Sequence, residues 1–362
     1  MKTDPGPPEN EAEVVRRAAD ILADRLPKSW AMQATTAGET ADKRVDALYE
    51  LTAPDGRSVT LVMEAKRVLE GRDVDSVTKQ LEEYTRRVSN GQGVLAARYL
   101  SPQVRARLVE SGLSFVDATG NVRLEVASPG LFINDRGADG DPWRGPGRPR
   151  GTLKGAPAAK VVRAIADFSG EWSIRDLVDV AQVSTGAGYR VVDFLEREGL
   201  AARTDRGVVI IPRWDKALRR WSEDYGFVRN SRVTRWIAPR GLGDLMVRAA
   251  KTDPSAYAVT GTLAAAEWAA YAPARSAMIY TKNADETAAQ WGIRPAEAGA
   301  NVMLAEPALD VPFVRSLTNT AGVQIAAPSQ VVVDLMTGPG RSPQEAEELL
   351  EWMVANEQSW RG

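Results

Sequence analysis

A chain of 362 residues, of which 44% are hydrophobic and 26% charged, is long enough for two or three globular domains. It has neither cysteine nor histidine, which excludes disulfides, metal sites built on thiolates or imidazoles, and catalysis by either residue type. A formal net charge of −2 excludes a globally basic protein of the histone type, so a nucleic-acid surface would have to be a local patch.

The sequence also carries signals about location. No apolar run approaches the roughly 18 residues that span a bilayer. The beginning, MKTDPGPPENEAEVV, lacks the charged and apolar regions of a signal peptide. We therefore expect a cytoplasmic protein with no membrane partner.

The first part of the chain predicts an α/β domain over residues 10–140. Residues 1–9 are rich in proline and glycine and are expected to be a disordered tail, after which Asn10 caps a helix that Pro27 ends. Strands and helices then alternate, which is typical of a domain around a central sheet. The expected elements are a hairpin of strands at 45–51 and 59–68 with its turn at 53–56, a helix at 75–89, a strand at 93–100, a helix at 101–112 and a strand at 114–119.

Two carboxylates and a lysine stand on this hairpin in a pattern suited to metal-dependent hydrolysis. Period-two alternation places Glu64 and Lys66 on one face of the second strand, and a register pairing residue 46 with residue 64 brings Asp46 beside Glu64. Because sulfur and imidazole ligands are missing, such a pair favours Mg²⁺ or Mn²⁺, while Lys66 would position the attacking water. Gln80 and Tyr84, four residues apart, share a face of the next helix.

These five residues resemble the motif of the PD-(D/E)XK, or restriction-endonuclease-like, superfamily, with Gln80-x-x-x-Tyr84 as in its RecB-like branch. The resemblance covers about residues 10–135 and implies a restriction-endonuclease-like sheet domain. It also implies that Asp46 and Glu64 bind metal and that Lys66 assists hydrolysis.

A glutamate of the first helix often assists in that family, and here it would be Glu11 or Glu13. No obvious proline precedes Asp46, and many members of the superfamily are inactive binding modules. The alternative is therefore a salt bridge between Glu64 and Lys66 on an inactive scaffold.

Residues 141–156 form a basic linker rich in glycine and proline. Within it, Gly147-Arg148-Pro149-Arg150-Gly151 matches the core of an AT-hook, in which proline keeps the chain extended and the two arginines lie along a narrow minor groove. The alternative is a solvated linker.

Residues 157–222 predict a winged helix-turn-helix. A first helix spans about 158–168, Ser173 caps a second, and Ser184 caps a third after a tight connection at 181–183. Two short strands, 200–203 and 208–211, follow and would form the wing.

The outward face of the third helix carries Ser184, Thr185, Tyr189 and Arg190. Small hydroxyl residues let a helix enter the major groove, where arginine and tyrosine reach phosphates or base edges. The wing would add two cations, Arg203 and Arg206. The alternative is a winged helix used only for protein contacts.

Residues 223–362 predict a C-terminal α/β domain, with strands near 277–281, 301–304 and 323–326 and a closing helix near 343–356. Trp268, Tyr271, Trp291 and Trp352 are expected in its core.

Several short segments resemble bacterial, and notably actinobacterial, winged-helix proteins related to the type IV abortive-infection antitoxins. They are SGLSFVDATGNVRL (111–124), YAVTGTLAA (257–265), ANVMLAEP (300–307) and AAPSQVVVDL (326–335). The resemblance implies DNA binding through the winged helix, repression of the protein's own operon, and a C-terminal domain that contributes to binding or contacts a partner. Within the first segment, Asp117, Gly120 and Asn121 form a turn that is either functional or structural, because Gly120 and Asn121 suit a positive φ.

The expected architecture is multidomain α/β plus a winged helix-turn-helix. The expected function is sequence-specific binding of double-stranded DNA by a transcriptional regulator, a possible homodimer, without a cofactor. The alternative is a DNA nuclease dependent on Mg²⁺ or Mn²⁺, with a role in phage defence. In a third interpretation the C-terminal domain binds a protein partner such as a toxin.

Overall fold

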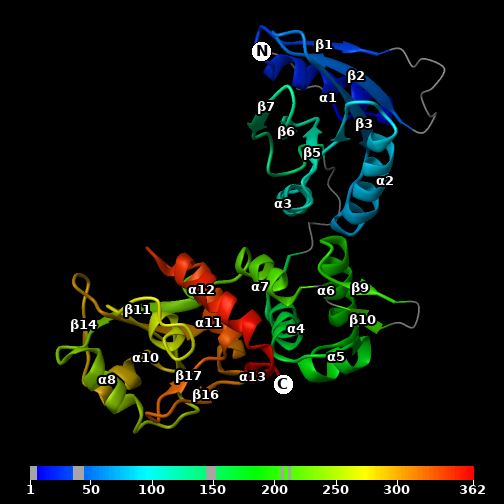
Figure 1. Cartoon of the computed structure of the whole chain (residues 1–362). Helices are drawn as coiled ribbons and strands as arrows, with labels where there is room; N and C mark the ends of the chain where they lie inside the picture. The colour runs from blue at the N-terminus through cyan, green and yellow to red at the C-terminus, as the bar shows by residue number, and fades with distance from the viewer. Residues whose placement is uncertain (1–5, 36–44, 144–151, 205–207, 211–212) are drawn as a thin grey trace. The chain divides into compact units, whose positions relative to one another are not determined.

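A computed structural model describes residues 6–35, 45–143, 152–204, 208–210 and 213–362. The chain is a mixed α/β protein that divides into two compact units (Figure 1). The N-terminal unit comprises Met1–Arg148 with Glu196–Gly199, and the C-terminal unit comprises Pro149–Leu195 with Leu200–Gly362.

One sheet of seven strands, adjacent in chain order, organises the N-terminal unit (Figure 1). Its three middle strands are parallel, and the outer strands join them as antiparallel hairpins. The strands are β1 (Ala31–Ala34), β2 (Ala47–Thr52), β3 (Ser58–Lys66), β4 (Gly91–Ala97), β5 (Ser114–Asp117), β6 (Val122–Val126) and β7 (Leu131–Asp135).

Helices cover both faces of this sheet. On one face α1 (Glu11–Arg25) packs its apolar side on alternate residues of β3, including Leu61 and Met63. On the other face α2 (Val74–Arg86) and α3 (Pro102–Glu110), with the short helix η1 (Gly71–Asp73), pack on Val62 and its neighbours. Because α2 and α3 each connect parallel strands, they cross the sheet on the same side.

The predicted elements of this unit are confirmed, with ends shifted by a few residues. Asn10 caps α1, since its side chain accepts a hydrogen bond from the Glu13 N–H at 2.9 Å. The hairpin turn closes where expected, with Gly56 at φ 82°. Strands β1, β6 and β7 were not predicted. Strand β1 is an edge strand with mostly exposed residues, so it shows no apolar alternation.

The central segment, residues 156–210, begins the C-terminal unit. Its order is helix, strand, helix, helix and two strands, and its sheet has the spatial order β8-β10-β9. The predicted helices and both late strands are confirmed, while β8 was not predicted. The elements are α4 (Ala156–Asp167), β8 (Trp172–Ser173), α5 (Ile174–Ala181), α6 (Thr185–Arg197), β9 (Ala202–Arg203) and β10 (Val208–Ile210).

The rest of this unit surrounds a second, mixed sheet of seven strands. Helix α7 (Trp214–Ser222) leads into it. The strands, in spatial order, are β14 (Arg294–Pro295), β11 (Ser231–Ile237), β15 (Val302–Pro307), β13 (Ala277–Thr281), β12 (Tyr257–Thr260), β17 (Gln324–Ile325) and β16 (Leu317–Thr318). The helices are α8 (Gly241–Ala249), α9 (Gly261–Ala265), α10 (Ala284–Trp291), η2 (Val311–Phe313), α11 (Pro328–Met336), α12 (Ser342–Ala355) and α13 (Glu357–Trp360).

The central segment and this second sheet share one continuous hydrophobic core. The end of the chain strengthens the connection, because the Arg361 guanidinium donates to the carbonyls of Ile165 and Phe168 at the end of α4. These carbonyls have no partner inside the helix, so the arginine satisfies them.

Of the four aromatic residues expected in the core, Trp291 is buried and Trp268 and Trp352 pack on the core half-buried. The prediction is wrong for Tyr271, which is 49% exposed. Among the helices that the structure describes, none has both the length and the apolar character needed to cross a bilayer.

Candidate functional site

The carboxylate–lysine group predicted on the hairpin lies at the end of β3 in the N-terminal unit. The antiparallel register pairs Ala47 with Met63, which sets Asp46 opposite Glu64 as expected. The Asp46 side chain accepts a hydrogen bond from the Ala65 N–H at 2.8 Å. This bond fixes the carboxylate against the end of the neighbouring strand.

Residues of α2 complete the group. Gln80 donates through Nε2 to Glu64 Oε1 at 2.9 Å and lies 3.1 Å from the Tyr84 hydroxyl, so both helix residues point to the strand. Lys66 Nζ donates to the same oxygen of Glu64 at 2.5 Å. The structure therefore brings together the residues that the spacing selected.

Burial makes Glu64 the unusual member of this group, because it is only 3% exposed. Burial raises the pKa of Glu64 above its ordinary value despite the opposing charge of Lys66, and the negative charge of Asp46 acts in the same direction as burial. Burial disfavours the charged form of Lys66, but the hydrogen bond and charge of Glu64 outweigh it and raise the pKa of Lys66.

The second oxygen of Glu64, Oε2, is buried and has no hydrogen-bond partner among the residues that the structure describes. Leaving a buried carboxylate oxygen without a donor or a cation costs free energy. The residues thus fit an oxygen-ligated divalent ion, which often binds one or two carboxylates and keeps several waters. No group of three or more Asp, Glu, His or Cys side chains that could hold a metal ion occurs in the described part of the chain, so an ion held by Asp46 and Glu64 would take its remaining ligands from water or substrate.

The two glutamates of α1 differ in their surroundings. The negative charge of Glu11 helps to raise the pKa of both Glu64 and Lys66, which places Glu11 near the group. Glu13 instead forms a 2.6 Å ion pair with Arg17. Of the two candidates, Glu11 is the one whose charge acts on Glu64.

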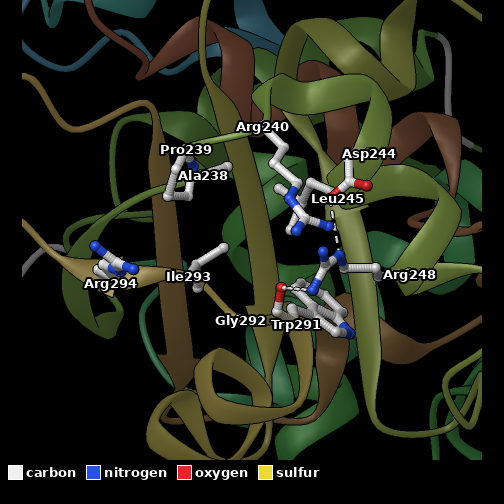
Figure 2. A pocket seen from close by; sticks show the side chains of 10 residues that line it. All are labelled: Ala238, Pro239, Arg240, Asp244, Leu245, Arg248, Trp291, Gly292, Ile293 and Arg294. Atoms are coloured by element: carbon white, nitrogen blue, oxygen red, sulfur yellow. Dashed lines mark hydrogen bonds and ion pairs between the residues drawn. The ribbon is translucent and has the colours of Figure 1, made fainter.

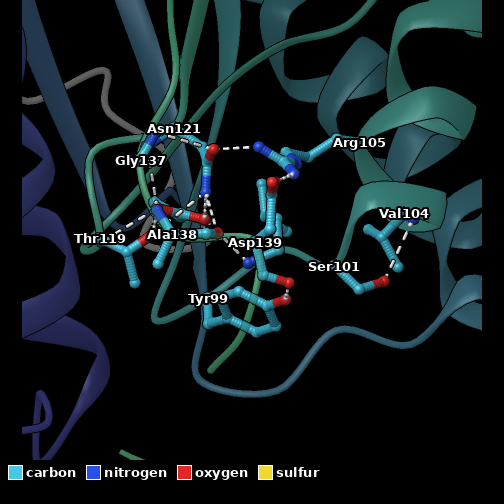
Figure 3. Close-up of polar contacts among 11 residues, drawn as sticks. Tyr99, Ser101, Val104, Arg105, Thr119, Asn121, Gly137, Ala138 and Asp139 are labelled. Atoms are coloured by element: carbon cyan, nitrogen blue, oxygen red, sulfur yellow. Dashed lines mark hydrogen bonds and ion pairs between the residues drawn. The ribbon is translucent and has the colours of Figure 1, made fainter. Parts of the chain in front are cut away.

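The loop after β5 is a closed hydrogen-bond network. Asp117 is fully buried and accepts through Oδ1 from the Thr119 N–H at 2.9 Å and through Oδ2 from Asn121 Nδ2 at 2.8 Å. Figure 3 shows Asn121 in contact with Arg105, Thr119, Gly137 and Ala138.

Both carboxylate oxygens of Asp117 are satisfied within this network, which favours a structural role. Gly120 has φ 98° as expected. The expectation for Asn121 is wrong, since its backbone lies outside the left-handed region and its side chain is used for hydrogen bonds instead.

The start of α6 is the second candidate surface. Ser184, Thr185, Tyr189 and Arg190 are all exposed, while the opposite face of the helix is buried. Ser184 Oγ accepts a hydrogen bond from the Ala187 N–H at 3.3 Å, as expected for its cap position. No hydrogen bond or ion pair of the Arg190 side chain is found within the described ranges.

One predicted wing residue is held beside this helix. Arg203 forms an ion pair of 2.5 Å with Asp193, and its guanidinium lies 5.4 Å from the centre of the Tyr189 ring. The hairpin strand and the helix therefore present one joint surface. The predicted contact residues Arg148, Arg150 and Arg206 lie outside the described residues.

Comparison of the chain with protein-family models, curated proteins and solved structures yields no match. The two family resemblances stated above therefore remain predictions, and function must be argued from the chain's own residues.

Sequence reasoning did not select Gly188, which sets the distance between α5 and α6. A β-carbon at this position would lie 2.5 Å from Cγ2 of Val178. The connection between the helices also needs Gln182 in the left-handed region, at φ 51°. In the sequence, the signal for this close helix contact is a small residue on the buried face of α6.

Proposed function

We propose that the chain binds double-stranded DNA through the central segment, folded as a winged helix-turn-helix. The observation that carries this proposal is the exposed start of α6, where two hydroxyl residues, a tyrosine and an arginine without a described partner share one surface. In such a fold the N-terminal residues of the third helix contact base edges in the major groove. The strands β9 and β10 then form the wing, and Arg203 would exchange its ion pair with Asp193 for a phosphate beside the groove.

The local architecture supports this use of the surface. Ala187, Val191 and Leu195 of α6 are buried in the core, so the helix is supported from behind. Gly188 lets α5 approach closely, as two crossing helices of this motif require. The basic residues described on this surface are Arg190 and Arg203, and Arg203 is paired with Asp193, so Arg190 carries the unpaired positive charge of the surface.

Duplex selection followed by fluorescence anisotropy tests this function in the full chain. Bound sequences are first recovered from genomic fragments and then titrated at several salt concentrations. We expect affinity to fall with salt, and Arg190→Ala to weaken binding and to reduce the salt slope by about one unit if one phosphate contact is lost. Lys251→Ala, an exposed cation of the C-terminal unit, is the matched control. Equal affinities of Arg190→Ala and wild type would contradict the proposal.

The proposal includes the role implied by the resemblance to antitoxins, a repressor of its own operon. A dimer bound to two half-sites would have a higher affinity for DNA. The C-terminal region would contact either the protomer bound to the other half-site or a toxin. Genome-wide immunoprecipitation tests this role. Recovered fragments should include the promoter upstream of the chain's own gene, and their absence would exclude autoregulation.

A second candidate function is DNA cleavage dependent on Mg²⁺ or Mn²⁺ by the N-terminal unit. The specific observation that favours it is the buried Glu64 Oε2 without a partner, beside Asp46 and Lys66. When bound to these carboxylates, a divalent ion would supply an activated water and charge stabilisation.

Each residue of this group would have its own role in the cleavage reaction. Asp46 is oriented by the Ala65 N–H, and Glu64 is oriented by Gln80, so both carboxylates are fixed before any ligand binds. Lys66 lies within reach of Glu64 and would turn its ammonium group to a phosphate oxygen or to water. Tyr84 holds Gln80 in place.

Cleavage of single-stranded, linear and supercoiled DNA with each metal tests the second candidate. We expect activity to be lost in Glu64→Gln and Lys66→Ala and kept in Glu82→Gln, which changes an exposed glutamate of α2 outside the group. No cleavage of any DNA form with either metal, by a chain that still binds DNA, would exclude the nuclease and leave DNA binding intact.

A further inference from the structure

A pocket of about 200 Å³ in the C-terminal unit carries three arginines, and we name it the arginine pocket (Figure 2). It is formed where the end of β11, helix α8, the end of α10 and strand β14 meet. Its charged residues are Arg240, Asp244, Arg248 and Arg294. Neither candidate function described above uses this pocket.

Arg248 is fixed within the pocket. Its Nε donates to Asp244 at 2.8 Å, one turn earlier on α8, and its Nη1 donates to the carbonyl of Trp291 at 3.1 Å. The close approach depends on Gly292, which caps α10 at φ 62° and whose added β-carbon would lie 2.9 Å from Nη1 of Arg248. Trp291 is itself buried and fixed by a hydrogen bond from its indole to Thr252 at 2.8 Å.

Arg240 and Arg294 are the available cations. Both side chains are exposed, and neither makes a hydrogen bond or ion pair with any residue in the described ranges. Arg240 precedes α8, and Arg294 approaches from β14, on the side of Ile293 away from Trp291 (Figure 2). The two free guanidinium groups therefore belong to separate elements and, as Figure 2 shows, lie at opposite sides of the pocket.

The charges do not balance within the pocket. Three arginines face one carboxylate, Asp244, which leaves a net charge of two positive units. No side chain caps the first turn of α8, which begins directly after Arg240, so the positive end of the helix dipole adds to the same field. Like charges gathered in a concave site are stabilised by an anion of opposite charge.

We propose that the arginine pocket binds a small molecule through a phosphate monoester group. A dianionic phosphate matches the net charge of the pocket, and the planar guanidinium group of Arg240 binds two of its oxygens, while Arg294 contacts the far part of the ligand. The volume lies below the range of about 300–1,000 Å³ typical of pockets for drug-sized ligands, so the ligand is a small phosphorylated metabolite or free phosphate.

Calorimetric titration of the full chain tests the proposal. The probes are inorganic phosphate, ribose 5-phosphate and unphosphorylated ribose, at constant ionic strength maintained with sodium chloride. We expect saturable binding of at least one phosphate probe and none of ribose. The double variant Arg240→Gln/Arg294→Gln should bind ribose 5-phosphate about a hundredfold and inorganic phosphate about tenfold more weakly, since each lost charge-assisted contact costs about tenfold and Arg294 contacts only the larger probe.

Arg235→Gln is the matched control, because it removes an exposed arginine of β11 that does not line the pocket, and it should bind as wild type does. Binding of ribose 5-phosphate but not phosphate identifies a sugar phosphate, and binding of both identifies the phosphate group alone as sufficient. The absence of saturable binding, or equal binding by the double variant, would overturn the proposal. Loss of duplex DNA affinity in the double variant without any binding of small phosphates would overturn it in favour of a nucleic-acid contact.

Discussion

Arg163 and Asp167, one turn apart on α4, form a 2.9 Å ion pair in which each side chain is only 2% exposed. Arg163 also donates to the Val311 carbonyl at 2.9 Å and to Gln330 Oε1 at 3.0 Å, while Asp167 accepts from Ser329 Oγ. Each charge is therefore paired and hydrogen-bonded across the boundary between the central segment and the second sheet. Separating the two parts would leave buried charges without partners.

Arg163→Met should lower the free energy of unfolding by about 3–5 kcal/mol, because it leaves the Asp167 carboxylate buried without its cation. Urea denaturation of the full chain measures this loss. Arg219→Gln is the control, since its ion pair with Glu347 is about half exposed and such pairs contribute at most about 1 kcal/mol. Equal losses in the two variants would show that the buried pair does not stabilise the unit.

Asp334 predicts a pH dependence of stability. It is fully buried, and burial raises its pKa from 3.8 to about 7, although hydrogen bonds from Thr260 and Tyr280 at 2.7 Å oppose the shift. The folded chain thus keeps this proton at a pH where the unfolded chain has lost it. The stabilising contribution is complete below the unfolded pKa of about 4 and is lost as the pH rises to about 7.

Asp334→Asn should remove this loss of stability with rising pH. Between about pH 4 and pH 7 the stability of wild type should fall by about 1–4 kcal/mol relative to that of Asp334→Asn. Urea denaturation at several pH values provides the comparison, with the exposed Asp310→Asn as a control that should follow wild type. Parallel pH profiles of wild type and Asp334→Asn would contradict the prediction.

Two glycines of α6 should respond oppositely to alanine. Gly188→Ala forces a β-carbon against Val178, whose branched side chain has little freedom, and should cost about 1–3 kcal/mol. Gly186→Ala meets only the end of the Arg190 side chain, at 3.7 Å, and should stabilise the helix by about 0.5–1 kcal/mol. Thermal unfolding distinguishes them, and a Gly188→Ala variant as stable as wild type would show that α5 and α6 can move apart freely.

Metal binding at Glu64 can be detected without a cleavage assay. If Mg²⁺ or Mn²⁺ binds the folded chain, its Tm should rise, and a concentration about 100 times Kd corresponds to about 2.7 kcal/mol. Glu64→Gln removes the unpartnered carboxylate oxygen and should abolish the rise, whereas Glu82→Gln should keep it. An equal rise in both variants would place the ion elsewhere.

Much of the N-terminal site could be predicted because its signals are local. The alternation of β3 sets Glu64 and Lys66 on one face, and a short hairpin turn sets the register that brings Asp46 opposite. Spacing on one helix pairs Gln80 with Tyr84. The contact between Gln80 and Glu64 needed the packing of α2 on the sheet, which no local pattern determines.

The sequence by itself determined where most helices begin and which faces are apolar, because caps such as Asn10 and Ser173 and the periodicity of apolar residues act within a few positions of the chain. Only the tertiary structure decided which charges are buried and which are free. Arg163 and Arg240 are both arginines next to apolar residues, yet one is enclosed by α11 and η2 and the other opens on a pocket. The reason is that burial and charge pairing depend on contacts between segments that are more than a hundred residues apart in the sequence. Hydrophobic packing brings these segments together, and because it is not directional, no local pattern specifies which segments meet.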